Sequence, residues 1–515
     1  MKKQKFLKIL SLATAASLAL VFAACNKTID TSTSSSETTT AETASSTSED
    51  LAESQTETFE TQKAVITESD ITINEEIENS ADGEHAIEVS GDTSSYSNIR
   101  VTKTGDSDSG DEADFYGDNA AVFATDGATL TIENAIVDTD GKHANGVFSY
   151  GEGTTVNISD SVINTSGNCS GGLMTTGGGT MNASNLNIHT TGNSSAAIRS
   201  DRGGGTVNVT GGSYVTEGRG SPVIYSTADI TVSDATLEST VSEGIVVEGK
   251  NSVTLNNVNL VANNIEKNSD KSSVYKAVMI YQSMSGDASV GMAEFTMTGG
   301  SLTNNNGDIF YVNNTTATIT LENAKFVNLD ESGIFLRAEA AGWGSEGKNG
   351  GKVNLYLNSQ ILEGDIAVDE ISALNMYIKS GSEFTGAINT DNEGEVYVEI
   401  ETGSKWILTG DSYITSLTCE PDAIDLNGYT LYVNGIAYNS GASEGEAIVL
   451  SSAESSGDHE GNPGEPPSGD KPGDPPDGHG GPGGDGEPPS GDRPGDPPDG
   501  HGGPGGDGEP PAKPD

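Results

Sequence analysis

Short stretches of alternating apolar and polar residues recur along the chain between residues 70 and 440. Each begins with an alternating strand and ends in a turn of small residues, as in the copies that start at Val156, Met181 and Val207. The interval is roughly 22–26 residues. Further copies start at Leu130, Ile230, Val253, Phe295 and Ile319. Because apolar residues recur with a period of two, the pattern predicts half-buried strands and excludes helical solenoids.

A second short strand follows the first in each repeat. It places an aliphatic residue inward after a small or polar one, as in Gly146-Val147-Phe148 and Gly244-Ile245-Val246. A repeat of about two dozen residues with two or three short strands has the size of one coil of a parallel β-helix. We therefore predict an all-β, parallel β-helix solenoid over residues 61–450. The longer intervals at 263–293 and 338–351 predict projecting loops.

The composition agrees with a thin core rather than a compact ball. Hydrophobic residues make up 33% of the 515 residues and aromatic residues 5%, below the roughly 45–50% apolar content of an ordinary globular domain. Stacked coils bury the same positions against one another, so little apolar surface is needed. With 77 acidic against 25 basic residues and a formal charge of -52, nucleic acid is excluded as a partner.

The two ends of the chain differ in composition from the repeats. Residues 1–25 carry lysines, an apolar run and then Ala23-Ala24-Cys25, which predicts a signal peptide whose end resembles a bacterial lipobox. Lipidation of Cys25 would tether the protein to the extracellular face of the bacterial cell membrane. Phe22 stands where that motif usually has Leu, so ordinary cleavage and secretion is the alternative. Residues 26–60, rich in Ser, Thr and Glu, predict a disordered spacer, and the Pro/Gly/Asp-rich repeats of 451–515 predict a disordered tail.

The repeat region, together with the closing segments at 404–413 and 427–435, resembles the pectin-lyase-like right-handed parallel β-helix family. It is most similar to repeat-rich, lipid- or wall-anchored adhesin-like proteins of Gram-positive gut bacteria. The resemblance implies a right-handed solenoid. It does not fix the function, because such folds include polysaccharide lyases, hydrolases, phage spikes and non-catalytic adhesins.

Catalytic and metal-binding signatures are weak. Asn389-Thr390-Asp391 matches the first element of the hydrolase pattern of this family, but the chain has no Asp-Asp dipeptide, and we predict a turn there. Cys169 and Cys419 are predicted to be buried as small apolar side chains. The six histidines lack metal-ligand spacing, so no zinc site and no catalytic residue is predicted. No cofactor is expected, and Ca²⁺ would be needed only if the protein is a lyase.

One concentration of positive charge interrupts the acidic repeats. Arginines on neighbouring coils, with Asp201, predict either an outward salt bridge or a polar groove for a glycan, flanked by Tyr150 and Tyr225. The candidate ligand-binding residues are Tyr150, Arg199, Asp201, Arg202, Arg219, Tyr225 and Trp343. Trp343, between two glycines, is expected to be an exposed contact, whereas Trp406 is expected in the core.

These features favour a non-catalytic surface lipoprotein, an adhesin that binds a polysaccharide or a host-surface glycan. Repeated Asn, Thr and Ser side chains on successive coils would meet an extended polymer along its length. A Ca²⁺-dependent polysaccharide lyase or a glycoside hydrolase on the same fold is the alternative. A third reading is a structural spacer that binds a protein partner.

Overall fold

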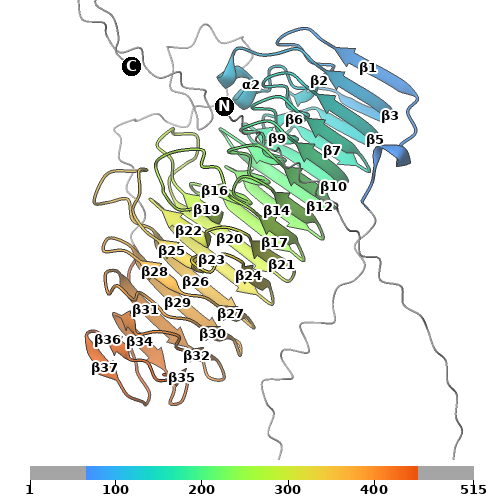
Figure 1. The fold of residues 1–515 in the computed structure, drawn as a ribbon. Helices are drawn as coiled ribbons and strands as arrows, with labels where there is room; N and C mark the ends of the chain where they lie inside the picture. The colour runs from blue at the N-terminus through green and yellow to red at the C-terminus, as the bar shows by residue number, and fades with distance from the viewer. Residues whose placement is uncertain (1–64, 451–515) are drawn as a thin grey trace, which may run out of the picture. The chain divides into compact units, whose positions relative to one another are not determined.

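The structure is a computed structural model that describes residues 65–450. The predicted signal peptide with Cys25, the spacer and the tail lie outside the described residues. Within 65–450, short parallel strands stack coil upon coil in one column (Figure 1). The predicted fold class, a right-handed parallel β-helix solenoid, is confirmed. None of the helices between residues 65 and 450 has the length and apolar character to cross a bilayer.

Two long parallel sheets carry the solenoid. The larger, sheet A, has 19 strands: β1 (Glu75–Asn79), β3 (Thr93–Lys103), β5 (Thr129–Thr139), β7 (Thr155–Ser159), β8 (Val162–Thr165), β10 (Gly179–Thr190), β12 (Gly205–Thr216), β14 (Asp229–Ser233), β15 (Thr236–Ser239), β17 (Ser252–Asn256), β18 (Asn259–Ala262), β20 (Met292–Thr298), β21 (Ser301–Asn304), β23 (Thr316–Glu322), β24 (Lys325–Asn328), β26 (Lys352–Asn358), β29 (Ala373–Lys379), β31 (Glu395–Ile400) and β34 (Ser416–Cys419).

Sheet B contains the second strand of most coils. Its 11 strands are β2 (Ile87–Ser90), β4 (Val122–Thr125), β6 (Val147–Tyr150), β9 (Leu173–Thr176), β11 (Ile198–Ser200), β13 (Ile224–Ser226), β16 (Ile245–Glu248), β19 (Lys276–Tyr281), β22 (Asp308–Asn313), β25 (Leu336–Ala338) and β28 (Ile366–Val368). The smaller sheets contain β27 (Ile361–Glu363), β30 (Glu383–Thr385), β32 (Lys405–Ile407), β35 (Ile424–Asp425), and β33 (Ser412–Ile414), β36 (Leu431–Val433), β37 (Ile436–Tyr438).

The in-register pairing of coils builds the core. In sheet B, Ile198 pairs with Leu173 on one side and Ile224 on the other, and Ile224 pairs with Ile245. All four side chains are buried in a single apolar cluster that continues along the solenoid. Because each aliphatic side chain contacts the same position of the next coil, the core is a thin column that needs few apolar residues per coil. This is the stacking that the low hydrophobic content predicted.

The small-residue turns within sheet A adopt the left-handed backbone conformation. Asn185, Gly211 and Asp234 occupy the same position of successive coils, with φ values of 52°, 70° and 55°. Glycine and the short Asn and Asp side chains are the residues that tolerate this region. The turn of small residues predicted at the end of each alternating strand is therefore confirmed.

A second, tighter turn leads from sheet A to sheet B. Its glycines stack directly: a Cβ atom built on Gly167 would lie 1.9 Å from the backbone oxygen of Gly141. Three residues after Gly167, the backbone N–H of Ser170 donates a hydrogen bond of 3.0 Å to the hydroxyl of Ser195 on the following coil. The turn thus buries polar groups that satisfy one another between coils.

Insertions between the strands lie on the outer face of sheet B. The prediction of one continuous loop over 263–293 is wrong, because β19 lies inside it and pairs with β16 and β22. Only 263–275 and 282–291 lie outside strands, while 339–351 is a loop as predicted. The sequence pattern did not predict α2 (Gly110–Tyr116); the other helix is a single 3-10 turn, η1 (Glu68–Asp70).

The last described strands leave the parallel pattern. β36 pairs with β37 in antiparallel fashion, and Ser443 forms an antiparallel bridge with Cys419 on β34. The chain then runs back over earlier coils, where Ile448 and the Asn375 side chain exchange hydrogen bonds of 2.9 and 3.0 Å. Trp406 is fully buried, as expected for the core, and Thr390 and Asp391 lie in a turn, as predicted.

Candidate functional site

A row of outward-facing side chains on sheet B forms the floor of a cavity. The strand register places Arg199, Tyr225, Val246 and Met279 side by side on successive coils. Helix α2 and the loops 263–275, 282–291 and 339–351 rise around this row. They enclose a cavity of about 490 Å³, which lies within the roughly 300–1,000 Å³ range of small-molecule sites.

Two arginines hold the cavity wall together through ion pairs. Arg199 lies 2.7 Å from a carboxylate oxygen of Asp201 and 3.4 Å from one of Asp114 on α2. Its side chain is 13% exposed and that of Asp201 is 6% exposed. Arg202 instead pairs with Asp287 at 2.7 Å, and its guanidinium lies 4.0 Å from the centre of the Phe115 ring. These contacts dock α2 and the 282–291 loop onto the coils.

Aromatic side chains form the opposite part of the wall. Trp343 packs edge-on against Tyr281, with ring centres 5.3 Å apart, and the Lys271 ammonium lies 5.8 Å from the tryptophan ring. The hydroxyls of Tyr225 and Tyr281 both donate to the same oxygen of Glu248. Burial raises the pKa of both tyrosines and of Glu248, and it lowers the pKa of Lys276. The wall therefore mixes flat apolar rings with desolvated polar groups.

The cavity brings together four of the seven residues that the sequence singled out. Arg199, Asp201, Tyr225 and Trp343 line it. Arg202 lies behind the wall through its contacts with Phe115 and Asp287. The Arg199–Asp201 salt bridge exists, but both side chains are nearly buried rather than outward in solvent.

The remaining candidates lie elsewhere or in a different environment. Tyr150 packs against Tyr116 and Phe123 instead of lining the cavity. Arg219 is exposed and is not part of the cavity wall. The expectation of an exposed Trp343 is wrong, because only 9% of its surface is accessible once it packs on Tyr281.

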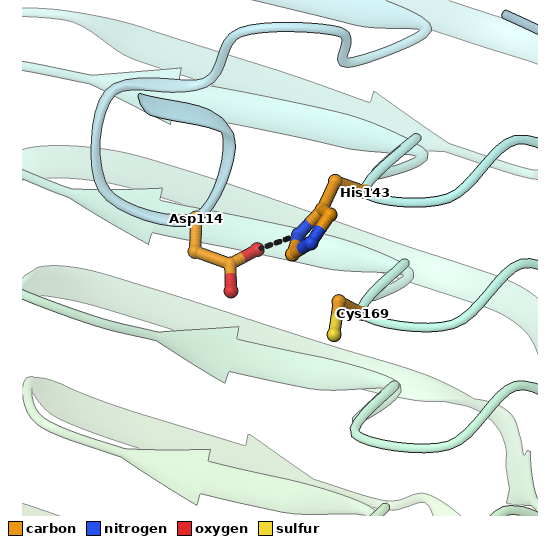
Figure 2. A group of neighbouring side chains, drawn as sticks. All are labelled: Asp114, His143 and Cys169. Carbon is orange, nitrogen blue, oxygen red and sulfur yellow. Dashed lines mark hydrogen bonds and ion pairs between the residues drawn. The ribbon is translucent and has the colours of Figure 1, made fainter. Parts of the chain in front are cut away.

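Three further residues of the wall were not among the candidates. Nδ1 of His143 lies 3.0 Å from a carboxylate oxygen of Asp114, and Cys169 lies on the coil that follows His143. Figure 2 shows the three side chains directed toward one another from α2 and from two stacked turns. One ligand atom from each residue lies within 4.8 Å of the other two. The buried position predicted for Cys169 is confirmed, but its neighbours are polar.

An alignment of the tight turns places His143 and Cys169 together, although it does not indicate Asp114, which lies on α2. After the stacked glycine, the second residue is His143, Cys169, Ser194 or Gly220 on four successive coils, all with φ between 55° and 64°. Spacing along the chain does not indicate this pair, because His143 and Cys169 meet only when each turn lies directly on the previous one.

Asp201 gives the site a pH dependence. Burial, helped by the carboxylates of Asp114 and Asp287, outweighs the attraction of Arg199 and raises the pKa of Asp201 to about 7. The native protein thus keeps a proton that the unfolded chain releases near pH 4. The stabilisation that this proton gives is complete below pH 4 and is lost as the pH rises to about 7.

We therefore expect the stability of the wild type, relative to Asp201→Asn, to fall between pH 4 and pH 7. Urea unfolding of both proteins across this range measures the difference. The Asn side chain does not ionise, so the pH dependence of this variant's stability reflects all other titrating groups. Subtracting it from the wild-type dependence isolates the contribution of Asp201. A difference that stays constant or grows in favour of the wild type would contradict the raised pKa.

Comparison with known proteins found no protein-family model that matches the chain and no similar curated protein.

Proposed function

We propose that the protein is a glycan-binding surface protein and that one saccharide unit of the glycan occupies the cavity on sheet B. The observation that supports this most is the combination of aromatic rings and nearly buried charged groups around a volume of about 490 Å³. Aromatic faces such as those of Tyr225 and Trp343 suit the apolar faces of sugar rings. The carboxylates and guanidinium of the wall suit hydroxyl groups, because charged partners form the stronger hydrogen bonds.

The cavity supports this proposal better than the polar ladders along the outside of sheet A. Asn182 donates a hydrogen bond of 2.9 Å to Asn157, and Asn208 donates one of 3.0 Å to Asn182. These amides already use part of their hydrogen-bonding capacity on one another. The ladder remains a second contact for an extended polymer, whereas the cavity would provide the specificity.

Two features of the chain outside the cavity support the proposed location and role. The lipobox-like segment ending at Cys25 supports attachment to the extracellular face of the membrane. The resemblance to pectin-lyase-like, adhesin-like lipoproteins supports a role in adhesion to polysaccharides or host glycans.

The test incubates the full chain with plant, mucin and microbial polysaccharides, with Ca²⁺ or with EDTA, and measures both retained polymer and shortened products. We expect retention of intact polymer by at least one class. Absence of both retention and products across the panel would contradict glycan binding and would direct the search to protein partners.

Matched variants locate the binding site on the chain. Trp343→Ala removes an aromatic ring of the wall, and Arg202→Ala removes the contacts with Phe115 and Asp287 that dock α2 and the 282–291 loop around the cavity. Each should weaken retention by about tenfold or more, the effect of losing about 1.4 kcal/mol of binding energy. Arg219→Ala removes the same charge from an exposed position outside the cavity and should leave retention unchanged. Equal retention by all three variants would place binding on the ladders instead.

A second candidate, a glycoside hydrolase, is favoured by Asp201. A carboxylic acid with a pKa of about 7 can donate a proton to a leaving oxygen at neutral pH, while an ionised carboxylate nearby activates water. Asp287 and Asp114 line the same cavity and could fill the second role. Shortened polymer in the same samples would favour this candidate, and Asp201→Asn should then abolish the products while retention persists.

A further inference from the structure

The group formed by Asp114, His143 and Cys169 combines three different kinds of metal ligand in the cavity wall. We propose that these residues bind a divalent transition-metal ion of the zinc class. Carboxylate, imidazole and thiolate are the ligands that zinc takes in proteins, and a site with three protein ligands keeps a fourth position open. A thiolate and an imidazole favour zinc or a similar transition metal over Ca²⁺ or Mg²⁺.

The geometry requires only a small contraction. One ligand atom from each residue lies within 4.8 Å of the others, whereas ligand atoms around a tetrahedral zinc ion lie about 3.5 Å apart, given bonds of about 2.0–2.3 Å. His143 and Cys169 are fixed by the stacked turns. Asp114 belongs to α2, a helix of seven residues in the segment between β3 and β4, so a small movement of this helix and its side chain would close the site.

The surroundings suit such an ion. His143 and Cys169 are 6% and 8% exposed, and all three residues line the cavity, so the open position would face its interior. Two negative ligands would balance the charge of the metal. The nearby guanidinium of Arg199 does not oppose binding, because Asp201 pairs with it at 2.7 Å. Its contact with Asp114 at 3.4 Å would orient that carboxylate from outside the site.

The backbone conformation adds an independent argument. His143 and Cys169 have φ values of 56° and 57° at a turn position where the next two coils use Ser194 and Gly220. Glycine adopts this region without strain, whereas bulkier side chains rarely do so. The turn directs both side chains, from adjacent coils, toward the carboxylate of Asp114. This inference holds whether or not the cavity binds a saccharide.

Cobalt provides a direct test on the full chain carrying Cys25→Ser, which leaves Cys169 and Cys419 as its only thiols. We expect one equivalent of Co²⁺ to bind at pH 7.5 and to give the near-ultraviolet charge-transfer absorption of a cobalt–thiolate bond. Zn²⁺ should displace it and remove the absorption. The thiolate band separates this site from histidines and carboxylates elsewhere in the chain.

The ligand variants should each weaken Zn²⁺ binding by more than the roughly 10–100-fold cost of losing an outer partner of a metal site. Cys169→Ser should also abolish the thiolate band, and His143→Gln should alter it. Cys419→Ser removes the other buried thiol, and His189→Gln removes a histidine that pairs with Glu217 at 3.0 Å. Both controls should bind as the parent protein does.

A thiol-protection measurement covers the case in which Cys169→Ser fails to fold. Zn²⁺ at one equivalent should slow alkylation of Cys169 by iodoacetamide in the parent protein at least tenfold, with no change at Cys419. The proposal is overturned if no stoichiometric binding occurs, if the band persists in folded Cys169→Ser, or if Zn²⁺ gives no protection. In that last case rapid alkylation would indicate a reactive thiol beside His143 rather than a metal ligand.

Discussion

Replacing Arg199 with methionine is expected to lower the free energy of unfolding at pH 8 by about 3–5 kcal/mol. Methionine fills a similar volume, but it leaves Asp201 and Asp114 without their cationic partner. Their side chains are 6% and 16% exposed, so water compensates little of the lost interaction. The penalty arises from desolvated carboxylates and not from a cavity. Urea unfolding followed by circular dichroism measures it.

Arg100→Met is the matched control. Arg100 also bridges two carboxylates, those of Glu68 and Asp138, but its side chain is 32% exposed. Solvent-exposed ion pairs contribute about 0–1 kcal/mol, so this variant should lose no more than that. The double variant Arg199→Met, Asp201→Asn should recover part of the loss, because one of the two carboxylates no longer carries a charge. Equal losses for Arg199→Met and Arg100→Met would show that the buried network contributes little.

Gly167→Ala is expected to cost at least about 3 kcal/mol, the upper part of the range for overpacking. The added methyl carbon would lie 1.9 Å from the backbone oxygen of Gly141. Because that atom belongs to the backbone of the neighbouring coil, the clash can be relieved only by separating two coils. Separation would also break the serine hydrogen bonds of the turn. The midpoint of urea unfolding is the measurement.

Gly127→Ala separates the steric effect from the conformational one. Gly127 has a φ of 76°, and no atom lies within 4 Å of the position where its Cβ would be. This variant should lose only about 1 kcal/mol, the cost of a left-handed alanine. A similar small loss for Gly167→Ala would mean that the coils stack less rigidly than the contact implies.

The solenoid could be predicted from the sequence because each coil repeats the same local rules. Alternating aliphatic residues and turn-forming Asn, Asp and Gly recur at one interval, and in-register stacking follows from that repetition. The strand β19 was missed because the insertions on both sides of it interrupt the interval. Lys276, at the start of that strand, is charged, so the sequence did not indicate that it is buried beside Glu243 and under the surrounding loops.

The cavity was only partly predictable. The arginine cluster at Arg199 was visible because its members are close in sequence. Its enclosure was not, because the covering groups come from α2 and from three insertions whose paths the repeat does not determine. The Asp114–His143–Cys169 group was not predictable for the same reason, since His143 and Cys169 meet across stacked turns and Asp114 reaches them from α2. Trp343 was placed in the correct loop, but a sequence cannot show that Tyr281 lies beneath it.

The antiparallel hairpin of β36 and β37 limits how far the stacking can continue. A parallel β-helix ends in unpaired strand edges, and such edges can recruit another molecule and grow into fibres. Here the reversed strand direction and the Cys419–Ser443 bridge present the wrong polarity to an incoming parallel coil. The returning segment around Ile448 covers part of the outer surface near that end. This end of the described solenoid would thereby resist the addition of further parallel coils from a second molecule.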